Sequence, residues 1–202
     1  MYTYGYLFYI PINLFLSAIF LFSGLYNRKK IAYYLFATLF CVYLNLLIKK
    51  AFFPIFTIGA RHYTRLIDYI NWDVTQLLEY KPYQIVGNIL LTFPIGVLLP
   101  FVINGKSKMR LGIAVCLSVA IEFVQLGMIG TLHLMDVMFD INDILLNVVG
   151  CLLGHFFFLI FCKVYARVTK EECRNSILFY FNQVCDNCAC NEGSLSGLMK
   201  AR

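Results

Sequence analysis

The chain has 202 residues, of which 60% are hydrophobic and only 14% are charged, and its formal net charge at pH 7 is +6. This composition excludes an ordinary soluble domain and is typical of an integral membrane protein. The basic residues stand in short clusters between apolar runs, which is the pattern of membrane topology signals and argues against nucleic-acid binding.

Two apolar runs, residues 7–26 and 31–48, predict a pair of antiparallel transmembrane helices within residues 1–50. The first run has no basic segment before it and no small-residue cleavage site, so we expect a retained helix and not a signal peptide. Residues 51–84 are more polar. We expect them to form an external or re-entrant segment with short helical pieces.

Three further runs, residues 85–103, 111–129 and 144–162, predict a three-helix core within residues 85–163. We therefore predict an all-α fold, a polytopic membrane bundle of five transmembrane helices. Residues 164–202 are expected to form a cytoplasmic, partly disordered tail. Its cysteines, Cys173, Cys185, Cys188 and Cys190, are expected to be reduced, because no second CxxC pair completes a zinc site.

The clusters of Lys and Arg predict the orientation of the bundle. Three such residues follow each of the first, third and fifth runs, whereas the connection after the fourth run has none. Because short cytoplasmic loops are enriched in Lys and Arg, we expect the N-terminus outside and the C-terminus in the cytoplasm.

The most informative stretch runs from residue 136 to residue 154, where polar and Gly residues recur at steps of three and four. This spacing predicts one stripe along a single helix. The stripe comprises Asp136, Asp140, Asp143, Asn147, Gly150 and Gly154. Polar groups in a membrane helix are costly unless they face protein or water, so we expect the stripe to point into the bundle.

Three of the predicted helices bring polar residues to a similar depth. Asn88 and Asn147 each lie about 4.5 Å below the outer ends of their helices, at 1.5 Å per residue. In the fourth run, Gln125 lies about 6 Å and Glu122 about 10 Å below the outer end. We therefore predict an outward-facing polar pocket formed by Asn88, Glu122, Gln125, Asp140, Asp143 and Asn147.

Carboxylates in such a pocket need a partner, because a bare charge in a low-dielectric site is too costly. A proton, a ligand, or a basic side chain such as Arg61 or Arg65 would serve. A divalent metal ion is a further alternative, although no cofactor is predicted. In the simplest alternative, the amides form interhelical hydrogen bonds and the Asp residues cap a helix.

Three blocks of this sequence resemble the VanZ-like family in order and spacing, over about residues 70–160. They read Asn88-Ile-Leu-Leu-Thr-Phe-Pro94-Ile-Gly96-Val-Leu-Leu-Pro100, Glu122-Phe-Val-Gln125 and Asp140-Ile-Asn-Asp143-Ile-Leu-Leu-Asn147-Val-Val-Gly150. The segment Asn71-Trp72-Asp73 resembles the extended stretch that precedes the first block in the family.

The resemblance also shows one departure. Family members usually carry an Arg three residues before the first Asp of the last block, and this chain has Val137 there. We expect His133 or an external Arg to replace that cation. The auxiliary positions to the pocket are thus Arg61, Arg65, His133 and Asp136.

The resemblance implies a small multi-pass protein of the bacterial cell membrane. The family is named for a member that confers low-level teicoplanin resistance, and it brings no established catalytic mechanism. Our leading hypothesis is a non-enzymatic envelope protein whose pocket binds a lipid head group, an envelope precursor or the glycopeptide antibiotic itself. The alternatives are a membrane enzyme using carboxylate or metal-assisted chemistry, and a proton-coupled transporter in which Glu122 titrates.

Overall fold

A computed structural model describes residues 5–52, 67, 70–132, 139–168 and 176–191. Its elements in chain order are α1 (Gly5–Tyr26), α2 (Ile31–Phe52), β1 (Ile70–Asn71), the 3-10 helix η2 (Val74–Glu79), α3 (Pro82–Val102), α4 (Ser107–Leu132), β2 (Phe139–Asp140), α5 (Ile141–Val168) and α6 (Ser176–Asn191). Over the described residues, α2, α3, α4 and α5 are long and apolar enough to cross a membrane, and α1 contributes a shorter apolar helix, Ile10–Tyr26. The predicted all-α polytopic membrane bundle is confirmed.

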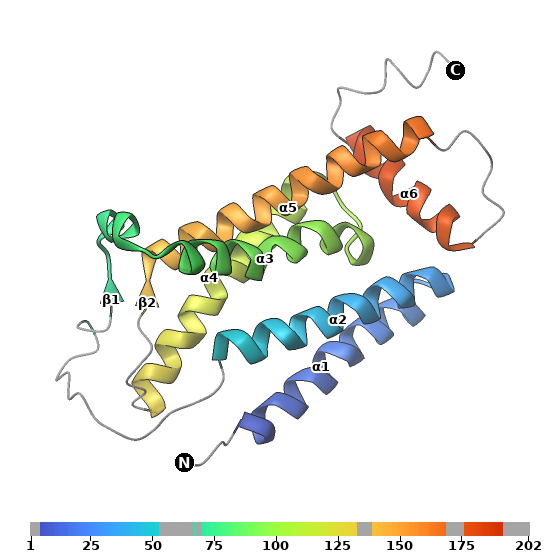
Figure 1. Cartoon of the computed structure of the whole chain (residues 1–202). Helices are drawn as coiled ribbons and strands as arrows, with labels where there is room; N and C mark the ends of the chain where they lie inside the picture. The colour runs from blue at the N-terminus through green and yellow to red at the C-terminus, as the bar shows by residue number, and fades with distance from the viewer. Residues whose placement is uncertain (1–4, 53–66, 68–69, 133–138, 169–175, 192–202) are drawn as a thin grey trace.

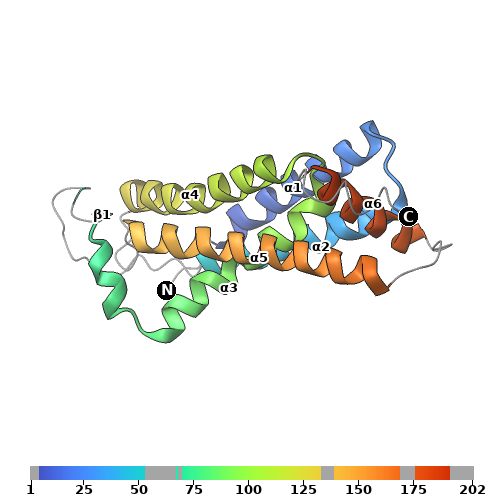
Figure 2. The ribbon, with the colours of Figure 1, turned by 90° about the horizontal axis from the view of Figure 1, so that it is seen from above.

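The helices run up and down along a common direction. The turns at residues 27–30 and 103–106 lie at the end of the bundle that carries α6 (Figures 1 and 2). The other end gathers β1, β2, η2 and the first turns of α3 and α5 (Figure 1). We call this second end the strand end.

The helices α3 and α5 form the closest pair in the bundle and run parallel. Asn88 bonds to Asp143, and Thr92 bonds to the carbonyl of Asn147, so both pairs are separated by the same 55 residues. Their backbones touch where glycines leave room. A Cβ atom added at Gly154 would lie 2.0 Å from the carbonyl oxygen of Phe93. The polar and Gly stripe therefore points into the bundle from Asp143 onward, as predicted.

The helix α6 is an ordered element within the tail, which was expected to be partly disordered. Its buried residues Tyr180, Val184 and Cys185 recur at helical spacing and face the bundle. The hydroxyl of Tyr180 donates to the carbonyl of Phe101 in α3. Such a short amphipathic helix has too little overall hydrophobicity to resemble a membrane span, so only its contacts identify it.

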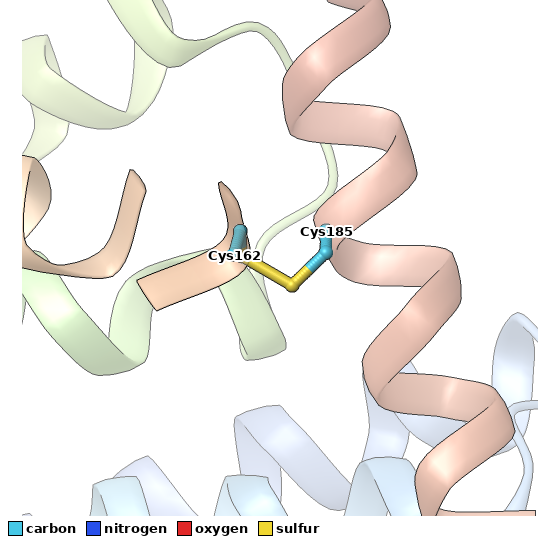
Figure 3. Close-up of a disulfide and its surroundings, with 2 residues drawn as sticks. All are labelled: Cys162 and Cys185. Atoms are coloured by element: carbon cyan, nitrogen blue, oxygen red, sulfur yellow. A yellow bond between two sulfur atoms is a disulfide. The ribbon is translucent and has the colours of Figure 1, made fainter. Parts of the chain in front are cut away.

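A disulfide joins α6 to the end of α5, between Cys162 and Cys185, with 5.3 Å between their Cα atoms (Figure 3). The prediction of a reduced thiol is therefore wrong for Cys185. Cys173 and the side chains of Cys188 and Cys190 lie outside the described part of the chain.

The outer surface of the bundle is apolar. Large hydrophobic side chains are exposed along all five helices from α1 to α5, among them Phe22, Leu35, Leu90, Phe123 and Phe156. A surface of this kind is a liability in water but is matched by acyl chains. The structure thus supports a lipid bilayer as the surroundings of α2 to α5.

Candidate functional site

Asp140 lies just before α5 and not within it. It belongs to β2, which pairs in parallel with β1 so that Asn71 stands opposite Asp140. The predicted single helix through Asp136 and Asp140 is therefore wrong at Asp140, and Asp136 lies outside the described residues. The physical reason is helix capping. The backbone N–H of Asn142 lies in the first turn of α5 and has no carbonyl partner within the helix, so it donates a hydrogen bond of 2.8 Å to Oδ1 of Asp140.

The second oxygen of Asp140 binds the segment that precedes α3. Its Oδ2 accepts hydrogen bonds from Nδ2 of Asn71, at 2.9 Å, and from the hydroxyl of Tyr80, at 2.6 Å. Nδ2 of Asn142 donates to the backbone carbonyl of Asp73, at 2.9 Å. These bonds fasten residues 70–80 to the beginning of α5.

Tyr80 is a site residue that the sequence pattern did not predict. Burial, followed by its hydrogen bond to Asp140, raises the pKa of the Tyr80 hydroxyl well above its usual range. The phenol therefore stays protonated and donates to the carboxylate. No helical or strand periodicity marks Tyr80; its only signal in the sequence is its place in a polar segment directly before a helix.

Asp143 is held between Asn88 of α3 and Tyr80, the residue that follows η2. Nδ2 of Asn88 donates to Oδ1 of Asp143, and the Tyr80 hydroxyl also interacts with this carboxylate. One turn further along, Oγ1 of Thr92 donates to the backbone carbonyl of Asn147 at 2.7 Å. Asn88 and Thr92 thus join α3 to α5, which is the role expected of interhelical hydrogen bonds.

Glu122 reaches the same place from α4. Only 2% of its surface is exposed, and its carboxylate receives the backbone N–H of Asp140 and lies close enough to Asp143 for electrostatic repulsion. Oε2 of Glu122 has no hydrogen-bond partner among the described residues. The rings of Phe123 and Phe139, 5.6 Å apart between centroids, pack α4 against β2.

The structure thus brings together four of the six residues predicted to form the pocket. With the two additions described above, they form what we call the polar cluster: Asn71, Tyr80, Asn88, Glu122, Asp140 and Asp143. Asn147 is buried one turn below, where its Oδ1 has no partner among the residues described. The cluster residues come from five different elements and, for Tyr80, from the connection between η2 and α3, so only the folded chain assembles them.

Gln125 lies apart from this cluster. Its Nε2 donates to the backbone carbonyl of Ala51, at the end of α2, over 3.1 Å. A step of three residues turns a side chain by about 60° around a helix, so Gln125 faces a different neighbour from Glu122. It also satisfies a carbonyl that the last turn of α2 leaves unpaired.

The electrostatics of the cluster are set by acids and neutral donors. The groups that most influence Glu122 and Asp143 are carboxylates, an amide, a phenol and a backbone N–H. The predicted cationic and auxiliary residues Arg61, Arg65, His133 and Asp136 lie outside the described residues, as does Val137. Within the described ranges, no group of three or more His, Cys, Asp or Glu side chains is placed to hold a metal ion.

Apolar helices and a carboxylate–amide network at one end define a multi-pass α-helical membrane protein with a buried polar network. The family model for VanZ/LLP1 matches residues 12–162, which include every residue of the polar cluster. The chain belongs to the VanZ/LLP1 family, as the sequence blocks predicted. Searches of curated proteins and of solved structures found no match.

Proposed function

We propose that this VanZ-family protein acts at the bacterial cell envelope and lowers susceptibility to glycopeptides such as teicoplanin. In this proposal the polar cluster is its functional site. The cluster binds a lipid head group, an envelope precursor or the glycopeptide. Binding of one of these molecules there would keep the antibiotic from its target.

The observation that carries the proposal is the state of Glu122. A buried polar atom without a hydrogen-bond partner costs free energy and is rare in proteins. Oε2 of Glu122 is such an atom among the described residues, and it lies beside two further carboxylates, Asp140 and Asp143. A ligand group that donates a hydrogen bond to this oxygen would remove that free-energy cost.

The charge distribution supports an outward-facing strand end. Arg28, Lys29, Lys30, Lys106 and Arg110 border the two turns at the opposite end, as expected of a cytoplasmic face. The disulfide lies at that opposite end too and argues against this orientation, because disulfides are uncommon in the cytoplasm. Both of its cysteines are buried, which shields the bond from soluble reductants.

The test is the teicoplanin susceptibility of a sensitive bacterial strain that expresses the chain. Glu122→Gln and Asp143→Asn each replace a carboxyl group of the cluster by an amide with almost no change in shape. Both are expected to return susceptibility to that of the strain without the protein. Glu79→Gln is the matched control, because Glu79 is an exposed acid at the same end and outside the cluster.

Membrane abundance of each variant is measured in parallel, so that a loss of protein is not mistaken for a loss of function. Normal abundance together with unchanged resistance in Glu122→Gln and Asp143→Asn would refute the role of the cluster. Equal losses in these variants and in Glu79→Gln would show that general charge, and not the cluster, determines the phenotype.

A further inference from the structure

The segment of residues 70–83 has a polar side that is tied to the polar cluster. Asn71 and Tyr80 both donate to Asp140, and β1 pairs with β2. Asp73 accepts from the backbone N–H of Thr75 at 2.9 Å and so begins η2. The position of this segment relative to the beginning of α5 is therefore set by specific hydrogen bonds.

The same segment exposes large apolar side chains. Leu78 is 89% exposed, Tyr83 is 69% exposed and Trp72 is 63% exposed. Charged and polar residues, including Glu79 and Lys81, stand between them. This mixture of aromatic, aliphatic and charged side chains is typical of segments that lie in the interface between a membrane and water.

The exposed apolar surface continues into α3 without a break in the chain. α3 begins at Pro82, directly after the segment, and exposes Val86 and Leu90 on its outer surface. Since α3 is long and apolar enough to cross a membrane, these two exposed side chains are suited to contact with lipid. The segment therefore stands where the lipid-facing surface of the bundle reaches the boundary of the bilayer.

We propose that residues 70–83 lie in the head-group layer of the leaflet at the strand end, with Trp72, Leu78 and Tyr83 immersed in lipid. The partner of this surface is thus the bilayer itself. Because Tyr80 of this segment contacts Asp140 and Asp143, the ligand of the polar cluster enters from the leaflet and is an amphiphile. This second step rests on the function proposed above.

Trp72 is the only tryptophan in the chain and reports directly on the segment. The full-length protein is reconstituted in phosphatidylcholine vesicles whose acyl chains carry bromine either near the head group or near the chain end. Bromine near the head group is expected to quench most of the Trp72 emission, and bromine near the chain end much less. Iodide in the aqueous phase is expected to quench it far less than it quenches free tryptophan.

Two further variants extend the measurement along the segment. Trp72→Phe combined with Leu78→Trp or with Tyr83→Trp moves the single tryptophan to another exposed position, and the same quenching pattern is expected. Strong iodide quenching without bromine quenching at all three positions would overturn the proposal. Protection from both quenchers would also overturn it, because a second copy or another protein would then cover the surface.

The experiment separates this inference from the proposed function. If bromine quenches Trp72 while Glu122→Gln leaves resistance unchanged, the lipid contact is correct and the function of the cluster is refuted. If bromine has no effect while Glu122→Gln abolishes resistance, the function stands and the ligand does not enter from the leaflet.

Discussion

The close contact between α3 and α5 predicts that a larger side chain at the contact lowers the free energy of unfolding. Gly154→Ala places a Cβ atom 2.0 Å from the carbonyl oxygen of Phe93. Real Cβ atoms essentially never approach closer than 3.0 Å, so the helices must separate by at least 1.0 Å (3.0 − 2.0) at this point. The obstacle is backbone and not a flexible side chain, so it cannot simply rotate away.

Overpacking of this kind costs about 1–3 kcal/mol. The higher helix propensity of Ala offsets about 1 kcal/mol of that cost. Gly87→Ala is the matched control, because it makes the same chemical change in α3 where a Cβ atom meets nothing within 4 Å. The propensity gain is common to both variants, so we expect Gly154→Ala to be less stable than Gly87→Ala by the full steric cost of about 1–3 kcal/mol.

The assay is equilibrium unfolding of the purified protein in mixed micelles with increasing SDS, followed by Trp72 fluorescence. Gly154→Ala is expected to unfold at a lower SDS fraction than the wild type, and Gly87→Ala at an equal or higher one. Equal stability of the two variants would refute the reasoning, because the backbones of α3 and α5 would then not touch at Gly154.

Two further predictions use the same assay. Thr92→Val removes the hydrogen bond to the carbonyl of Asn147 while keeping the side-chain volume; we expect a loss of about 0.6–2 kcal/mol, and an unchanged free energy of unfolding would contradict this. Tyr80→Phe removes the bond to Asp140 at a cost of about 1 kcal/mol at neutral pH. Because the pKa of Tyr80 is raised in the folded protein, its stabilising contribution is complete below about pH 10, the ordinary pKa of tyrosine, and declines as the pH rises toward the folded value. The difference between wild type and Tyr80→Phe should therefore shrink in alkali; a constant difference would show that the hydroxyl is not buried against the carboxylate.

Much of the site was predictable from local spacing. The period of a helix is a local property, so steps of three and four residues correctly placed Asp143, Asn147, Gly150 and Gly154 toward the interior of the bundle. Because successive spans cross the membrane in opposite directions, the sequence also predicted similar depths for Glu122 and Asp143. The two carboxyl groups do lie close together. Neither result required knowledge of which helices are neighbours around the bundle.

The amino-acid sequence by itself determined the membrane class, the helical architecture and the family, because hydrophobicity and periodicity act over one helix at a time. Only the tertiary structure decided that Asp140 caps α5 from a strand, since its partner Asn71 lies 69 residues away. The same holds for the contact of Gln125 with Ala51 and for the disulfide from Cys162 to Cys185. Each depends on how helices rotate and pack against distant neighbours, and no local pattern encodes that rotation.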